Sequence, residues 1–257
     1  MRRLSSKKKE DGDDEADDED GGDSDKDSLL PTDEGVQRFA WGLTYEGAKL
    51  IKKARIDWGD PAEGPMVPPG RYTAKLTANG QTQTTSFDVL PEPRLTLKAA
   101  DYEEQDRFAL RLRDDISKLT GIVNDLRSVR AQVKARNEAL KSVPSASALV
   151  KAGEALLPKL DALEERLHNP KAQVTYDILA MKGGAGCTRS SPLYTFAYEA
   201  DGVPTKGMRD VYAIYAKELA AGEAGGSPSW RRSEGLNQKA REAGVPARGA
   251  ARGRGVK

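Results

Sequence analysis

Two kinds of hydrophobic periodicity run along this chain. Residues 72–89 alternate apolar and polar side chains, as half-buried strands do, and the dipeptide Asn79-Gly80 favours a tight hairpin turn because both residues tolerate positive φ. Residues 37–45 alternate in the same way, so Phe39, Trp41, Leu43 and Tyr45 fall on one face. The pattern predicts strands at 37–45, 72–76 and 84–89, with Phe87 and Val89 on the inner face of the pair.

Beyond residue 98 the period becomes helical. Asp101 is predicted to be the N-cap of a long helix over 101–141, where polar Arg130 and Asn137 fall on the apolar stripe. That stripe, spaced by three and four residues as in a helix packed antiparallel against partners, consists of Leu112, Ile116, Leu119, Val123, Leu126, Val133 and Leu140.

A second helix is predicted after Pro144, with one apolar face formed by Leu149, Leu156, Leu160, Leu163 and Leu167. Pro158 within it predicts a kink or a break, and His168 is predicted to cap its C-terminal end, where the helix dipole favours a cation. Further helical segments are predicted at 175–181, 192–200 and 205–221.

The ends of the chain differ in charge, although the net charge is only +1. Residues 10–27 are almost entirely acidic and residues 231–257 are basic, and neither end has enough apolar side chains to form a core. We therefore expect a disordered acidic linker at 1–33 and a disordered basic tail at 223–257. Between them we expect a partial Ig- or fibronectin-III-like β-sandwich at 34–97, followed by an antiparallel α-helical bundle at 98–222.

The residues that carry chemistry do not form a catalytic pattern. The single cysteine, Cys187, excludes a disulfide framework and a cysteine-based zinc cluster, and His168 is the only histidine. The glycine cluster at 182–186 fits neither common phosphate-binding motif. Adjacent acidic pairs such as Asp114-Asp115 point to different sides of a helix. The sequence thus predicts no catalytic, cofactor-binding or metal-binding residues.

Aromatic side chains are the remaining candidates for ligand contact. Trp58 lies in a loop and breaks the alternation, and with Tyr45 and Tyr72 it is a candidate for stacking on a glycan. The alternative role of Trp58 is packing over the edge of the sandwich. Nucleic-acid binding is not predicted, because the basic tail lacks interleaved aromatic rings.

The sequence predicts neither a membrane span nor a secretory signal. No apolar run is long enough to span a membrane. The basic start of the chain is not followed by an apolar stretch, so it is not a secretory signal. The chain alone is therefore expected to be soluble and cytoplasmic.

Residues 37–45, 68–77, 109–114, 174–179 and 200–205 resemble a known family. They are similar to the Ig-like segment and following helices near the C-terminus of large sortilin-like, Asp-box β-propeller proteins, which are commonly labelled glycosyl hydrolases. The resemblance covers residues 35–220. The family's Trp-Asp-Leu-Arg-Tyr motif reads Trp41-Gly42-Leu43-Thr44-Tyr45 here, and its long last helix is interrupted after residue 221.

The resemblance implies a non-catalytic accessory module, the C-terminal fragment of a larger protein that is secreted or located in the cell envelope. Its implied partner is a protein: the missing propeller, or a second copy joined through the helices. One alternative is a carbohydrate-binding module that uses Trp58, Tyr45 and Tyr72. Another is that the glycosyl-hydrolase label is inherited from the propeller alone.

Overall fold

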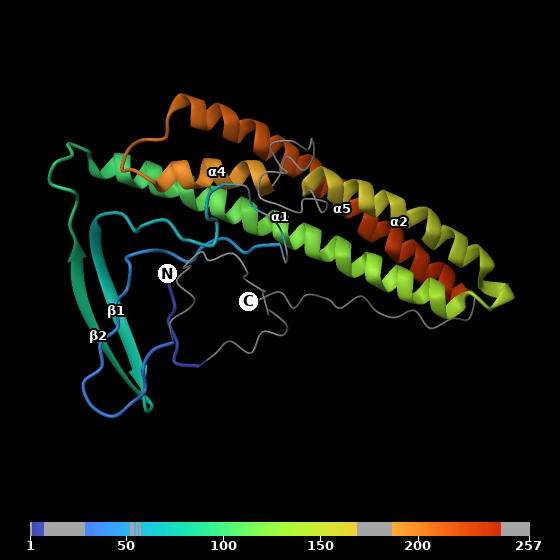
Figure 1. Ribbon diagram of the computed structural model, residues 1–257, viewed down its shortest axis with the longest axis horizontal. Coiled ribbons are helices and arrows are strands. Elements are labelled where there is room, and N and C mark those ends of the chain that lie inside the picture. The colour runs from blue at the N-terminus through green and yellow to red at the C-terminus, as the bar shows by residue number, and fades with distance from the viewer. Residues whose placement is uncertain are drawn as a thin grey trace.

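A long central helix organises the protein, with a β-ribbon at one end of it (Figure 1). The computed structural model describes residues 2–7, 29–51, 54, 56, 58–168 and 187–242, without the side chains of 187–189 and 225–242. Its elements in chain order are the strands β1 (Gly70–Ala78) and β2 (Gln81–Val89), helix α1 (Ala99–Leu140), the 3-10 turn η1 (Pro144–Ala146), and helices α2 (Ser147–Leu167), α4 (Cys187–Tyr198) and α5 (Lys206–Glu242).

The expected β-sandwich followed by a helical bundle is wrong. Within the described residues the sheet has only the two strands β1 and β2, and a sandwich needs two sheets packed face to face. Residues 37–45 do not form the predicted strand, because the positive φ of 57° at Leu43 interrupts extended backbone. Only Thr44 pairs, in an isolated bridge with Met66.

The hairpin between residues 72 and 89 is confirmed. β1 and β2 pair antiparallel from Gly70 opposite Val89 to Ala78 opposite Gln81. Asn79 and Gly80 form the turn with φ of 50° and 76°, the left-handed conformations that this dipeptide favours. The two strands together are called the ribbon below.

The apolar stripe of α1 is confirmed, because all seven of its predicted residues are buried. The two polar residues on the stripe have partners across the interface with α2. Arg130 donates to Glu164 Oε2 at 2.8 Å and to Asp161 Oδ1 at 2.9 Å, and Asn137 donates to the carbonyl oxygen of Val150 at 3.2 Å. The arginine and the amide nitrogen of Asn137 are therefore paired at the seam between α1 and α2, whereas the buried Oδ1 of Asn137 forms no hydrogen bond among the described residues.

Helix α2 carries the predicted leucine face, all of it buried, and continues without a break through Pro158. The predicted N-cap of α1 is shifted: Lys98 is the N-cap, and Asp101 lies three residues inside, where its Oδ2 accepts the Lys98 N–H at 2.8 Å. Helix α5 runs to Glu242, past the end expected at residue 221. The predicted helix at 175–181 and the glycine cluster at 182–186 lie outside the described residues.

Irregular segments between residues 43 and 67 pack against α4 and α1. They are held to each other by backbone bonds, from Tyr45 N–H to the Pro65 oxygen at 2.9 Å and from Ala48 N–H to the Pro61 oxygen at 2.7 Å. Gly64 makes this approach possible, because a Cβ there would collide with the carbonyl of Tyr45. The fold thereby brings the start of β1 close to the helices.

His168 is the C-cap of α2, as predicted, but the structure favours its neutral form. Its side chain is 2% exposed, and burial together with the positive charge of Arg127 lowers its pKa below the usual 6.5, against the opposing effect of Glu164. The cationic, dipole-compatible role expected from the sequence is therefore opposed by desolvation.

This lowered pKa predicts a pH dependence of stability. The unfolded chain takes up a proton on His168 near pH 6.5, before the folded protein does, so the free energy of unfolding should fall as the pH drops below that value. Urea unfolding from about pH 7.5 to about pH 5.5 measures this fall in the free energy of unfolding. In the variant His168→Asn the free energy of unfolding should depend less steeply on pH. Equal slopes in both proteins would contradict a lowered pKa.

Candidate functional site

An aromatic cluster anchors the ribbon at its root. The ring of Trp41 meets those of Tyr72 and Phe87 edge to face, with centroids 6.4 and 6.2 Å apart, and Tyr72 stacks on Phe87 at 6.0 Å. The indole N–H of Trp41 donates to the Thr44 oxygen at 2.9 Å. These contacts cover one face of the ribbon only near Gly70 and Val89.

Towards its turn the ribbon is uncovered. On the same face as Tyr72, Leu76 is 60% exposed, and both strand edges lack a neighbouring strand in the described part of the chain. A two-residue turn closes on a hydrogen-bonded pair, here Ala78 with Gln81, and such pairs alternate along the ribbon. Lys75 and Thr84 form a non-hydrogen-bonded pair, so their backbone N–H and C=O groups point outward from the two edges.

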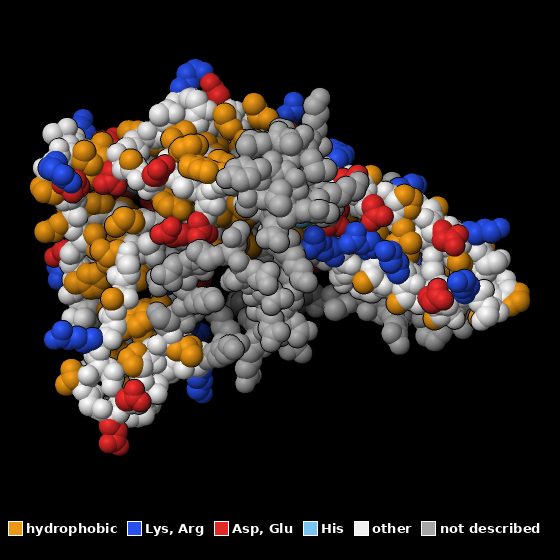
Figure 2. Space-filling model, in the orientation of Figure 1, with side chains coloured by type: hydrophobic (Ala, Val, Ile, Leu, Met, Phe, Trp, Pro, Cys, Tyr) orange, Lys and Arg blue, Asp and Glu red, His pale blue; other side chains and the backbone are white. Residues whose placement is uncertain are grey.

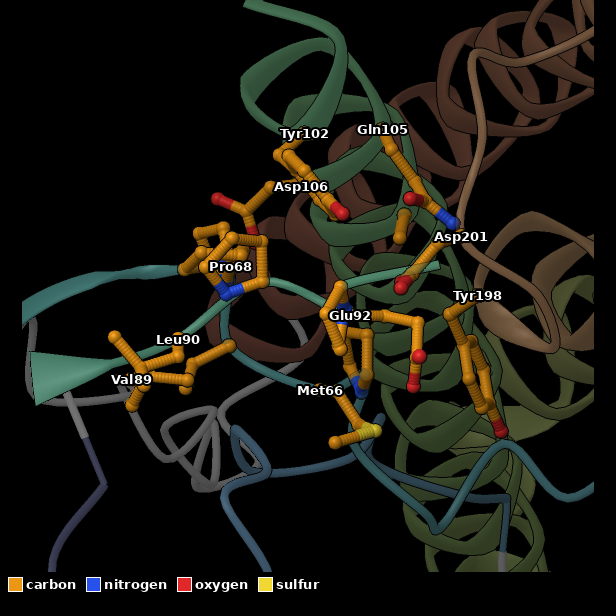
Figure 3. A pocket seen from close by; sticks show the side chains of 16 residues that line it. Met66, Pro68, Val89, Leu90, Glu92, Tyr102, Gln105, Asp106, Tyr198 and Asp201 are labelled. Atoms are coloured by element: carbon orange, nitrogen blue, oxygen red, sulfur yellow. The ribbon is translucent and has the colours of Figure 1, made fainter. Parts of the chain in front are cut away.

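A cleft of about 470 Å³ lies beside the root of the ribbon (Figure 3). In this view Tyr102, Gln105 and Asp106 approach it from α1, with Met66, Leu90 and Glu92 on the other side and Tyr198 and Asp201 at one end. Five prolines, at 65, 68, 69, 91 and 93, complete much of its apolar wall. The cleft thus joins segments before β1, after β2, in α1 and after α4.

Three carboxylates line this cleft, and its lining contains no lysine, arginine or histidine. Glu92 accepts from the side chain of Arg94 at 2.6 Å, which lowers its pKa, whereas Asp201 has no such partner in the described structure. Asp106 accepts a long bond of 3.5 Å from the Tyr45 hydroxyl, and desolvation raises its pKa. The cleft is therefore an acidic site.

Gln105 fixes the turn that carries Asp201. Its side-chain N–H groups donate to the carbonyl oxygens of Ala197 at 3.0 Å and Ala200 at 2.7 Å, and its Oε1 accepts the Gly202 N–H at 3.1 Å. The buried amide thereby satisfies the backbone at the end of α4 and holds Asp201 beside the cleft.

Tyr102 lies beside Gln105 and is only 7% exposed. Its hydroxyl oxygen is buried and forms no hydrogen bond within the described residues, and neither does Asp106 Oδ1. Burial raises the pKa of Tyr102, and the negative charges of Asp201 and Glu92 raise it further, which places both carboxylates within electrostatic reach of this hydroxyl.

The three residues predicted to contact a glycan do not form one platform. Tyr45 and Tyr72 lie beside the cleft: the Tyr45 hydroxyl bonds Asp106, and that of Tyr72 donates to the Pro68 oxygen at 2.6 Å. Burial and the charge of Asp106 raise the pKa of Tyr45 to about 12. Trp58 is half exposed and instead packs on Phe196 of α4, with ring centroids 4.6 Å apart.

Sequence reasoning did not find Tyr102, Asp106 or Asp201. The three lie on α1 and on the turn after α4, and no local pattern brings these segments together. The one available signal was the concentration of prolines on both sides of the ribbon, at 65–69 and 91–93. Prolines favour extended or turning backbone, which keeps both ends of the hairpin out of the helices.

The fold and cleft define a helical protein with a projecting β-ribbon and an acidic cleft at the root of that ribbon. No protein-family model, curated protein or solved structure matches the chain. None of the described helices is both long enough and apolar enough to cross a membrane.

Proposed function

We propose that this chain is a non-catalytic interaction module that docks a partner protein onto its ribbon. In line with the sequence resemblance, the partner is the propeller of a sortilin-like β-propeller protein or a second copy of this chain. One observation carries the proposal: the ribbon projects from the helices with both edges unpaired in the described structure and with Leu76 exposed on its apolar face.

An isolated two-stranded ribbon is only marginally stable in water, because it buries little apolar surface. Each of its edges also presents a row of N–H and C=O groups that can pair with another strand. A strand added by a partner satisfies one such row and covers the side chains that the aromatic cluster leaves open. Figure 2 shows hydrophobic side chains gathered on the ribbon side of the molecule, with charges of both signs around them and over the opposite, narrow end. This distribution supports docking at the ribbon end.

The burial of His168 supports a non-catalytic role. His168, the only histidine of the sequence, is enclosed at the end of α2, where it has little access to a substrate. The acidic side chains of the cleft lie among prolines and tyrosines, a composition suited to holding a ligand. We therefore assign binding, and not turnover, to the ribbon end.

Proline substitution at each edge tests the proposal. Lys75→Pro removes an outward N–H from β1 and Thr84→Pro removes one from β2, and neither removes a bond between the strands. One of the two variants should abolish association and the other should not, because strand addition uses one edge at a time. Sedimentation velocity and hydrogen exchange of the full chain measure this association. Both are carried out over a range of chain concentrations, and with any propeller domain that is encoded directly upstream.

Lys75→Thr is the matched control for the first variant, because it changes the side chain and keeps the N–H. Association that is equally strong in all three variants contradicts docking at the edges. Docking is also contradicted if the ribbon amides exchange hydrogen equally fast at all chain concentrations and with or without the propeller.

A further inference from the structure

The cleft at the root of the ribbon has a distinct ligand chemistry. Within its lining, acidic side chains are present and basic ones are not. Arg94 pairs with Glu92 from outside the lining. Desolvation raises the pKa of Asp106, and the positive charges of Arg113 and Arg107, which form ion pairs with other carboxylates, oppose that rise. Asp106 and Asp201 form no ion pair within the described residues, and they line the cleft from α1 and from the turn after α4.

Two buried polar atoms here lack the partners that buried groups normally have. The Tyr102 hydroxyl and Asp106 Oδ1 are closed to solvent and form no hydrogen bond among the described residues. The tyrosine is more than nine-tenths buried, and Figure 3 shows its hydroxyl directed towards the space between α1 and the segment after β2. Because unpaired buried polar groups are costly, this arrangement indicates a site that a hydrogen-bond donor completes.

The spacing of the carboxylates argues for an organic cation over a metal ion. No three histidine, cysteine or acidic side chains in the described part of the chain converge closely enough to hold a metal. The acidic groups are instead distributed around a cleft whose walls are proline, Met66, Leu90 and the tyrosine rings. A planar cation with several donors on an apolar stem fits such walls, since guanidinium groups stack on rings and bond carboxylates in several directions.

We propose that this cleft binds an arginine side chain of a partner protein, with its guanidinium group between Asp201, Asp106 and the Tyr102 hydroxyl and its stem against the prolines. This goes beyond docking at the ribbon edges, because it names a second contact with its own chemistry. The two can fail separately: the edge variants leave the cleft intact, and the cleft variants leave the edges intact.

Titration of the full chain with a capped glycine peptide that contains one arginine tests the proposal. Amide chemical shifts in nuclear magnetic resonance spectra should move around Tyr102, Gln105 and Asp201. The same peptide with citrulline, which has the shape of arginine without its charge, should not bind. Asp201→Asn should weaken binding about tenfold, because it removes a charged acceptor, and added salt should weaken it further.

Asp201 is the preferred substitution because it is exposed, so the variant is expected to fold. Glu138→Gln is the matched control, since it removes one exposed carboxylate at the far end of α1 and should bind the peptide as the unaltered chain does. Equal binding of the arginine and citrulline peptides overturns the proposal, as does equal binding by Asp201→Asn and Glu138→Gln. Shifts produced by calcium chloride but not by the arginine peptide also overturn it.

Discussion

Replacing Tyr194 with alanine is expected to lower the free energy of unfolding by about 3–5 kcal/mol, the usual cost of deleting a fully buried aromatic ring. Tyr194 in α4 is 0% exposed, and its ring meets that of Tyr198 edge to face with centroids 4.9 Å apart. Its hydroxyl donates to the Glu63 oxygen at 2.9 Å, and burial raises its pKa. The substitution therefore leaves a cavity and removes one of the bonds that hold the segments before β1 to α4.

Phe196→Ala is the matched control on the same helix, because this ring is half exposed and contacts only Trp58 among the aromatic rings of the described residues. Its cost should be about 1 kcal/mol or less, as for most exposed positions. Denaturant unfolding followed by circular dichroism gives both values. Equal losses would show that Tyr194 does not hold these segments to α4.

The second large effect concerns Glu164, whose substitution by alanine should cost about 2–4 kcal/mol, because it removes the shared acceptor of two arginines at a buried seam. Its side chain is 2% exposed, and it accepts from Arg127 at 2.7 Å and from Arg130 at 2.8 Å. Both arginines are partly exposed, so water compensates for some of the loss. The effect should therefore lie below that of breaking a fully buried pair.

Asp161→Ala provides the comparison, because Asp161 binds the same Arg130 at 2.9 Å with a half-exposed side chain. Its loss should cost about 1 kcal/mol or less, since exposed ion pairs contribute little. Urea unfolding at neutral pH separates the two variants. A loss at Asp161 as large as that at Glu164 would contradict the dependence on burial.

The predictions that held depend on contacts between residues near in sequence. The hairpin follows from alternation and from Asn79-Gly80, whose φ values match the turn that this dipeptide favours. The stripes of α1 and α2 follow from spacings of three and four residues, and every predicted stripe residue is buried. For these elements the local pattern and the global fold agree.

The prediction of a β-sandwich is wrong because an alternating pattern specifies a strand only if a partner strand is present. Residues 37–45 alternate as well as β1 does, yet Leu43 adopts a positive φ and the segment turns to pack Trp41 on the ribbon. The burial of His168 and its lowered pKa also escaped prediction, because they depend on how α2 meets its neighbours.

By itself, the sequence determined the hairpin, the two leucine-rich helix faces and the acidic and basic ends, because periodicity and composition act locally. Only the tertiary structure decided that the ribbon has no second sheet to pack on in the described residues, and that Tyr102, Asp106 and Asp201 share a cleft. The physical reason is sequence separation: residues about a hundred positions apart meet only through the packing of α4 on α1, which no local pattern encodes.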